Sequence, residues 1–280
     1  LAHARLSILD LSPAGHQPMA TPDGRYTLVF NGEIYNYREL REPLAARGVV
    51  FRSNSDTEVI LRAYEAHGPA CAEKFRGMFA FALWDARERR LHLVRDRMGE
   101  KPLYVHERPG TVTFASELRA LVRSGAPSGA LDEEAIDHYF HFLWVPEPRT
   151  PLADVRKLDA GHRMVVETAP WRVRISRWWN PEDAPPLERD PAATVRAMFE
   201  EVAPLVVRSD VPVGVALSGG LDSSTVAALA APHCPGLVAF SVGYEGRPPC
   251  DERADAAQLA SHLAIPLVEI ECRTADVVES

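Results

Sequence analysis

Apolar positions in the first 116 residues change repeatedly between two spacings. Short runs rich in aromatic and β-branched residues predict strands, and runs with an apolar residue at every third or fourth position predict helices. The predicted strands are residues 26–30, 78–85, 90–96, 102–107 and 111–116, and the predicted helices are 37–48 and 56–68. Short turns join the later strands, so we expect antiparallel hairpin neighbours with the helices packed on one sheet face, which is an α+β layered domain.

Three local signals refine this pattern. Ser55 and Glu58 have the spacing of a capping box before the second helix, and Gly68 is a natural end for that helix. The alternating residues 5–11 predict one more strand. The pair Asn31-Gly32 follows a strand and is typical of a tight hairpin turn, because both residue types tolerate a positive φ.

The pattern changes after the first domain. Prolines recur between about residues 146 and 191, which predicts irregular or edge structure and then a linker near 181–191. Beyond the linker the predicted elements alternate: helix 193–207, strand 213–217, a helix carried by Thr225 and the residues after it, strand 237–243, helix 251–264 and strand 266–271. This order predicts the start of an α/β parallel-sheet domain, whose ligands bind at the carboxyl ends of the strands. We therefore expect one domain over residues 1–180 and a second over residues 191–280.

The segment SGGLDSS, residues 218–224, interrupts an apolar run between a predicted strand and a predicted helix. Gly219 and Gly220 allow a tight turn and the close approach of a ligand, and the first NH groups of the helix favour an anion. The serines add hydroxyl donors, and Asp222 is a carboxylate placed to grip a Mg²⁺ ion that bridges phosphates. The alternative is a plain strand-turn-helix capped by Ser223. A kinase-type phosphate loop, GxxxxGK[ST], is not indicated, because no lysine follows the glycines.

Composition and charge narrow the class of protein. With 46% hydrophobic and 25% charged residues, the chain fits a globular protein with ordinary cores. The formal net charge of −8 and the lack of a basic tail argue against nucleic acid or an anionic membrane as a partner. No uncharged run is long enough to cross a bilayer and the start lacks a signal-peptide layout, so we expect a cytoplasmic location. The four cysteines stand far apart, which indicates neither a disulfide framework nor a zinc site.

The order of the motifs is more specific than any one of them. They run RLSILDL, GHQPM, NGEIYNYRELR, SDTEVIL, GMFAFALWD, RDRMGEKPLY, FASE and VRKLDAGH, with SGGLDSS after them. In this order they resemble the glutamine-dependent asparagine synthetases, in which an Ntn-type glutaminase domain precedes an ATP-pyrophosphatase domain. SGGLDSS itself looks like the pyrophosphate loop of enzymes that cleave ATP to AMP and pyrophosphate. The resemblance spans nearly the whole chain and implies a carbon–nitrogen ligase that takes its nitrogen from glutamine.

For the glutaminase domain, the resemblance implies attack by an amino-terminal cysteine thiolate on the carboxamide of glutamine. The oxyanion would be stabilised by the side-chain amide of Asn31 and the backbone NH of Gly32. Arg5 matches the clamp for the α-carboxylate of glutamine, and Asp56, helped by Glu33, matches the partner of its α-ammonium. An alternative for Asp56, compatible with the first, is a carboxylate favoured by the dipole at the first turn of a helix.

For the synthetase domain, the resemblance implies that ATP adenylates the side-chain carboxylate of aspartate and that ammonia then displaces AMP. The residues that match the ATP site are Leu217, Ser218, Gly219, Gly220, Asp222, Ser223, Ser224 and Val242. Asp222 is the expected Mg²⁺ contact, through the pyrophosphate. An alternative for the segment around Val242 is the end of a buried strand.

The chain departs from the family in one respect. The nucleophilic cysteine is absent, and the family places it a few tens of residues before the first residue of this sequence. Because the sequence opens on Leu1 and stops at residues 277–280, just after a predicted strand, we expect a fragment. Alternatives are a ligase similar to the β-lactam synthetases, with a different acceptor, and a regulatory homologue that binds ligands without chemistry. A homodimer is a further expectation.

Overall fold

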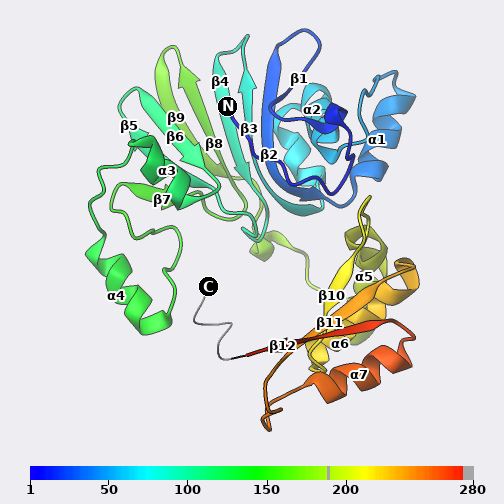
Figure 1. The fold of residues 1–280 in the computed structure, drawn as a ribbon. Helices are drawn as coiled ribbons and strands as arrows, with labels where there is room; N and C mark the ends of the chain where they lie inside the picture. Colours follow the sequence, from blue (N-terminus) through cyan, green and yellow to red (C-terminus); the bar gives the residue numbers. More distant parts are fainter. Residues whose placement is uncertain (188–189, 274–280) are drawn as a thin grey trace. The chain divides into compact units, whose positions relative to one another are not determined.

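The computed structural model describes residues 1–187 and 190–273, and the chain divides into two compact units, Leu1–Pro185 and Pro186–Ser280 (Figure 1). Residues 188–189, within the expected linker, and residues 274–280, at the end of the second expected domain, lie outside the described residues. Each unit is described by itself below.

The first unit contains two antiparallel sheets. The six-stranded sheet has the order β1-β2-β3-β4-β8-β9, with β1 Met19–Ala20, β2 Tyr26–Ile34, β3 Gly77–Asp85, β4 Arg90–Arg95, β8 His162–Thr168 and β9 Trp171–Arg177. The three-stranded sheet has the order β6-β5-β7, with β5 Tyr104–Arg108, β6 Thr111–Ala115 and β7 Val155–Lys157. The α-helices are α1 Tyr37–Ala46, α2 Asp56–His67, α3 Leu118–Ser124 and α4 Glu133–Phe142, and short 3₁₀ helices lie at Pro13–Gly15, Gly68–Lys74 and Pro181–Asp183.

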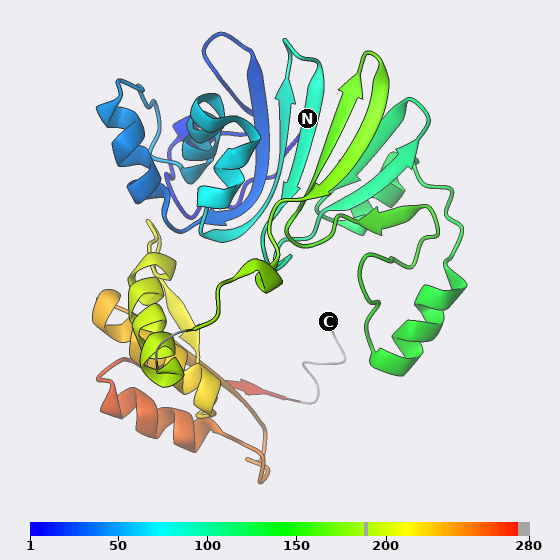
Figure 2. The ribbon, with the colours of Figure 1, turned by 180° about the vertical axis from the view of Figure 1, so that it is seen from behind.

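The central strands β2, β3 and β4 of the six-stranded sheet are largely apolar on both faces, because both faces are covered there. Leu28, Phe81 and Leu83 point to one face, where they pack with Ile60 and Tyr64 of α2. The alternating residues point to the other face, where they pack with Val105 and other side chains around β5; they include Val29, Ala80, Ala82 and Leu93. Figures 1 and 2 show α1 and α2 on one side of this sheet and β5 and β6 on the other. The predicted α+β layered fold with antiparallel sheets and helices is therefore confirmed.

The strand predicted over residues 5–11 is wrong, because side chains occupy the backbone groups of this segment. The guanidinium of Arg5 donates to the carbonyl oxygens of Leu9 and Asp10, each at 2.7 Å. The carboxylate of Asp10 accepts the backbone NH groups of Ser12 at 3.1 Å and Asn54 at 2.7 Å. Such local bonds compete with a sheet ladder, and the segment runs as an irregular loop.

The prediction that the later strands form one series of hairpin neighbours is only partly right. β3 pairs with β4 and β5 pairs with β6, but β4 and β5 belong to different sheets. The connection between them is turned by Asp96, whose carboxylate accepts the backbone NH groups of Phe79, Met98, Glu100 and Lys101 at 3.0–3.1 Å. The proline-containing stretch after residue 146 also holds more regular structure than expected, since β8 lies inside the six-stranded sheet.

The second unit begins with α5 Pro191–Val206 and continues as β10 Gly214–Ala216, α6 Leu221–Ala230, β11 Val238–Tyr244, α7 Arg253–His262 and β12 Leu267–Cys272, with a 3₁₀ helix at Ala231–His233. The three strands are parallel in the order β10-β11-β12, which confirms the predicted start of an α/β domain. Val215 and Ala239 of the sheet pack against Ala227 of α6 and Ala256 of α7. Across the described residues of both units, no helix is long and apolar enough to cross a membrane.

Candidate functional site

One cavity of about 150 Å³ in the first unit collects all five residues that the sequence assigned to glutamine. Its wall is made by the irregular N-terminal loop, by β2, by the first turn of α2 and by single residues of β3 and of the loop before β5. The residues that line it are His3, Ala4, Arg5, Leu6, Ile8, Leu9, Gln17, Phe30, Asn31, Gly32, Glu33, Ser55, Asp56, Thr57, Met78 and Lys101. Segments more than 90 residues apart in the chain thus meet around one polar space.

Asn31 and Gly32 reach the cavity from within a strand, so the predicted tight Asn-Gly turn is wrong. β2 continues to Ile34, and Gly32 pairs with Phe79 of β3. Gly32 has a φ of +140°, and a Cβ there would lie 2.0 Å from the carbonyl oxygen of Met78. Only glycine fits where two strands approach so closely with this backbone conformation. The two expected oxyanion donors are therefore presented by a strand held rigidly in a sheet.

Two buried carboxylates lie at this cavity. Glu33 of β2 is 8% exposed and Asp56, the first residue of α2, is 6% exposed. Burial, together with the neighbouring charge of Asp56, raises the pKa of Glu33 to about 7, against the opposing charge of Lys101. Burial also raises the pKa of Asp56 to about 6, against hydrogen bonds that favour its charged form, the first of them from the backbone NH of Ile34 at 3.0 Å. The pair therefore favours a cationic ligand.

The start of α2 orients Asp56 by a different capping scheme from the one expected. The hydroxyl of Ser55 caps the helix by accepting the NH of Thr57 at 3.1 Å. Glu58 does not bond back to Ser55; its carboxylate accepts the NH groups of Arg52 and Ser53 at 2.7–3.0 Å. The predicted capping box is therefore wrong in the part of Glu58, whereas the helix and its end at Gly68 are confirmed. Asp56 is both a first-turn carboxylate and a cavity residue, so its two sequence interpretations are compatible.

Arg5 is half-buried at the cavity and is held in place by its own loop. Its contacts to the carbonyls of Leu9 and Asp10 fix the guanidinium, and Gly15 leaves room for it, because a Cβ at Gly15 would lie 2.3 Å from a terminal nitrogen of Arg5. A pre-positioned guanidinium loses little side-chain entropy when it binds a carboxylate.

Sequence reasoning gave no role to several polar residues of the cavity, among them Gln17 and Lys101. Both stand within the motifs GHQPM and RDRMGEKPLY, so the signal was present without a role attached to it. Lys101 is positioned through its backbone, whose NH donates to Asp96 at 3.0 Å and whose carbonyl accepts from Arg95 at 2.8 Å. Its charge is the one that opposes the raised pKa of Glu33.

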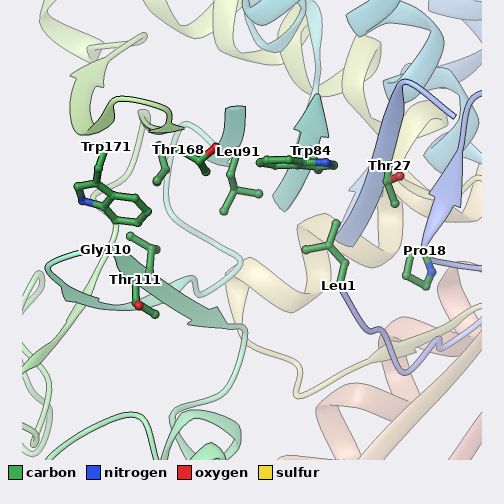
Figure 3. Close-up of a pocket in the computed structure, with 11 residues that line it drawn as sticks. Leu1, Pro18, Thr27, Trp84, Leu91, Gly110, Thr111, Thr168 and Trp171 are labelled. Carbon is green, nitrogen blue, oxygen red and sulfur yellow. The ribbon is translucent and has the colours of Figure 1, made fainter. Parts of the chain in front are cut away.

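A larger cavity of about 500 Å³ in the same unit contains none of the predicted site residues. Figure 3 shows the side chains of Trp84 and Trp171 on either side of Leu91, with Thr111 and Thr168 nearby. None of the residues that line it is charged and none is a histidine, so it offers no acid, base or ion-binding group. The smaller polar cavity is the candidate site.

In the second unit, the segment 218–224 forms the turn between β10 and α6. Gly219 has a φ of +81°, and a Cβ there would lie 2.5 Å from the Cβ of Asp255 on α7. Gly220 is the N-cap of α6 and provides no side-chain cap, so the alternative that Ser223 caps the helix is wrong. Instead, the Ser223 hydroxyl accepts the NH of Ser218 at 3.2 Å and bonds the Ser218 hydroxyl at 3.0 Å. The first NH groups of α6 are left without a side-chain acceptor.

The other expected ATP residues lie near this turn. Asp222 is exposed in the first turn of α6. The backbone NH of Leu217 donates to Phe240 of β11 at 2.8 Å, which places the turn beside the strand that contains Val242. Val242 is 58% exposed, so the alternative of a buried strand end is wrong for this residue. In the part of the chain that the structure describes, no three acidic, histidine or cysteine side chains lie together where they could hold a metal ion.

Comparison with known proteins identifies the family of the chain. Residues 1–179 match a family model described as a glutamine amidotransferase domain. The chain belongs to this family. Residues 194–280 match a second family model, described as asparagine synthase. The two matches follow one another in the order that the sequence motifs implied, and they confirm the resemblance.

Several curated relatives match most of this chain. Asparagine synthetase [glutamine-hydrolyzing] 1 of Bacillus subtilis is 39% identical over 244 residues, which cover 86% of this chain and 38% of that protein. Asparagine synthetase [glutamine-hydrolyzing] 2 of Arabidopsis thaliana is 36% identical over 263 residues, covering 89% of this chain and 39% of that protein. The chain thus spans about two fifths of the length of these relatives. A solved glutamine phosphoribosylpyrophosphate amidotransferase of B. subtilis aligns with a TM-score of 0.46 and 16% identity, covering 95% of this chain and 50% of that chain.

Proposed function

We propose that the protein acts in glutamine-dependent asparagine synthesis. In this proposal the first unit, with a domain over residues 1–180, binds glutamine for hydrolysis to ammonia. The second unit, with a domain over residues 191–280, contributes to the ATP site where aspartate is activated as aspartyl-AMP. The order of the two family matches and the names of the relatives support this assignment. The observation that carries it is the single cavity that gathers Arg5, Asn31, Gly32, Glu33 and Asp56.

The cavity residues divide naturally between the two ends of glutamine. The fixed fork of Arg5 suits the α-carboxylate, and the buried pair Glu33 and Asp56 suits the α-ammonium. At the other end, the amide of Asn31 and the NH of Gly32 would donate to the carboxamide oxygen as it becomes an oxyanion. Because both donors belong to a strand, they would need little reorganisation during the reaction.

The nucleophile of the proposed hydrolysis is not among the cavity residues. None of the cysteines lines the cavity, and burial in the core raises the pKa of Cys71 to about 12, so this thiol is inert. We therefore expect the 280-residue chain to bind glutamine without releasing ammonia from it.

In the second unit, Ser218, the two glycines, Ser223 and Ser224 would hold the pyrophosphate part of ATP with backbone NH and hydroxyl groups. The strand backbone at Leu217 and Val242 would lie on the adenine and ribose side. Asp222 would hold Mg²⁺, which supplies charge neutralisation at the phosphates when bound. A homodimer, a cytoplasmic location and the absence of nucleic-acid and membrane partners are further parts of this proposal; size-exclusion chromatography with light scattering tests the first of these.

Titration calorimetry of the 280-residue chain with L-glutamine tests the first half of the proposal. We expect Asp56→Asn to weaken binding at least tenfold at pH 8, because the anionic partner of the ammonium is lost. Asp137→Asn changes an exposed carboxylate on α4 and is the matched control, which should bind like the unsubstituted chain. Equal affinity in both variants would exclude this cavity as the glutamine site. In the complete protein, release of AMP that depends on an acceptor other than aspartate would favour the β-lactam synthetase-like alternative.

A further inference from the structure

Gln17 holds a position that neither the motifs nor the proposed chemistry explains. Its side chain is 4% exposed and lies between the 3₁₀ helix Pro13–Gly15 and β1, at the wall of the cavity. The side-chain oxygen accepts the backbone NH of Phe30 at 2.6 Å, and the side-chain nitrogen donates to the hydroxyl of Thr57 at 3.2 Å. The backbone NH of Phe30 can only donate a hydrogen bond, so the oxygen of the Gln17 amide, and not its nitrogen, must face β2.

The bond to Phe30 replaces a sheet bond that the backbone does not make. β1 pairs with β2 in the register Met19↔Leu28, and extending this register by two residues would place Gln17 opposite Phe30. β1 begins only at Met19, and the amide oxygen of Gln17 accepts the bond that a carbonyl of a longer β1 would accept. A buried NH without a partner costs about 1–3 kcal/mol, so this bond holds Phe30 in place.

The two partners of Gln17 flank the predicted site residues. Phe30 immediately precedes Asn31, and Thr57 immediately follows Asp56. A second link between the same elements lies at the other end of the segment, where Asp56 accepts the NH of Ile34 at 3.0 Å. The segment Asn31–Glu33 is therefore fastened to the start of α2 on both sides, at Phe30 by Gln17 and at Ile34 by Asp56.

The two links differ in what a ligand would do to them. The carboxylate of Asp56 would have to share its oxygens with a bound ammonium group. Gln17 has its amide oxygen on Phe30 and its amide nitrogen on Thr57, neither of which the proposed chemistry uses. The link through Gln17 thus keeps the strand and the helix at a fixed separation whether or not the ammonium site is filled.

We propose that Gln17 is a positioning residue that sets the distance between the oxyanion donors at Asn31 and Gly32 and the ammonium partner Asp56. That the ligand is glutamine rests on the proposed function. That Gln17 holds β2 and α2 together rests on the hydrogen bonds alone. A ligand that spans both ends of the cavity, such as glutamine, depends on that distance. A shorter amino acid such as alanine, which reaches only the α-carboxylate and α-ammonium partners, does not.

The test uses three variants of the 280-residue chain. Gln17→Met keeps the length of the side chain and removes both hydrogen bonds. Thr57→Val removes only the hydroxyl partner, and Thr57→Ser keeps it and serves as the matched control. Thermal melts of all three establish that the first unit is folded under the conditions of the measurements.

Hydrogen exchange followed by mass spectrometry gives the readout that is independent of glutamine. We expect peptides that contain residues 30–34 to exchange at least tenfold faster in Gln17→Met than in the unsubstituted chain, and faster in Thr57→Val than in Thr57→Ser. Peptides from β8 should be unchanged in all variants. Unchanged exchange of residues 30–34 in Gln17→Met would overturn the inference.

Calorimetric titrations with L-glutamine, and competition of L-alanine against it, give the second readout. We expect Gln17→Met and Thr57→Val to weaken glutamine binding about tenfold, which corresponds to about 1.4 kcal/mol, while alanine binding stays within twofold and Thr57→Ser behaves like the unsubstituted chain. Equal losses for glutamine and alanine would overturn the positioning role, because that is the result of general loosening. No glutamine binding by the unsubstituted chain would refute the proposed function instead, and the exchange data would still decide whether Gln17 fixes the strand.

Discussion

Replacing Glu33 by glutamine should stabilise the first unit at alkaline pH and weaken the binding of glutamine. Glu33 is 8% exposed, and burial together with the neighbouring Asp56 raises its pKa from 4.5 to about 7. The native state therefore holds the proton of Glu33 more tightly than the unfolded chain does. As the pH rises from about 4.5 through about 7, the carboxylate must ionise in a place that disfavours its charge, and stability is lost over this window.

The size of the effect follows from the difference between the two pKa values. From 4.5 to about 7 the difference is about 2.5 pH units, and at about 1.4 kcal/mol per unit it sets an upper limit of roughly 3 kcal/mol above pH 8. Because Asp56 relaxes when Glu33 loses its charge, we expect about 1–3 kcal/mol for Glu33→Gln at pH 8. For a unit of this size that is a rise in Tm of about 2–10 °C. At pH 4, below the ordinary value of 4.5, Glu33 is mostly protonated in both the folded and the unfolded chain, so the two proteins should melt within about 1 °C of each other.

Differential scanning calorimetry of the transition of the first unit, at pH 4 and pH 8, measures this difference. Glu42→Gln, on the exposed surface of α1, is the control that removes a carboxylate without burial and should change neither Tm. In the same samples at pH 8, glutamine should bind Glu33→Gln at least several-fold more weakly, since one negative charge facing its ammonium is gone. A Tm at pH 8 equal to or below that of the unsubstituted chain would refute the reasoning.

Three further substitutions test the roles proposed for individual residues. Arg5→Lys should weaken glutamine binding by about 1–3 kcal/mol in calorimetric titration, because a single ammonium replaces a fork that its own loop holds in place; unchanged affinity would show that Arg5 serves only the loop. Gly32→Ala should destabilise the first unit by about 3 kcal/mol or more in thermal melts, because the new Cβ would meet the carbonyl oxygen of Met78 at 2.0 Å; a Tm within 1 °C of the original would contradict this contact. In the complete protein, Asp222→Asn should abolish aspartate-dependent release of pyrophosphate from ATP and cost no more than about 1 kcal/mol of stability; near-normal release would leave Asp222 as a first-turn carboxylate alone.

The sequence by itself determined the features that depend on local spacing. The alternation of strands and helices predicted both layers of the first unit and the parallel order of the second. Ser55 and Gly68 marked the ends of α2, because a cap is a contact between residues a few positions apart. The motifs and their order also indicated the family, since each motif is a short segment that can be compared without knowing the fold.

The sequence misplaced Asn31 and Gly32, and the reason is tertiary. An Asn-Gly pair forms a turn when nothing else constrains it, but here the pair is held in β2 by a nine-residue ladder to β3. Residues 5–11 do not form the predicted strand for a related reason. The carbonyl oxygens of Leu9 and Asp10 accept from the side chain of Arg5, and the carboxylate of Asp10 bonds the backbone NH of Asn54, 44 residues away.

Only the tertiary structure decided which site residues lie close together and how their surroundings change their chemistry. Sequence spacing gives no sign that Glu33 and Asp56 share a buried space with Lys101, and it is this burial that raises both carboxyl pKa values. Gln17 stood unremarked within its motif because its role exists only where its amide meets Phe30 and Thr57. Local periodicity decides which residues form an element, whereas desolvation and hydrogen bonds between distant segments depend on distances that only the folded chain creates.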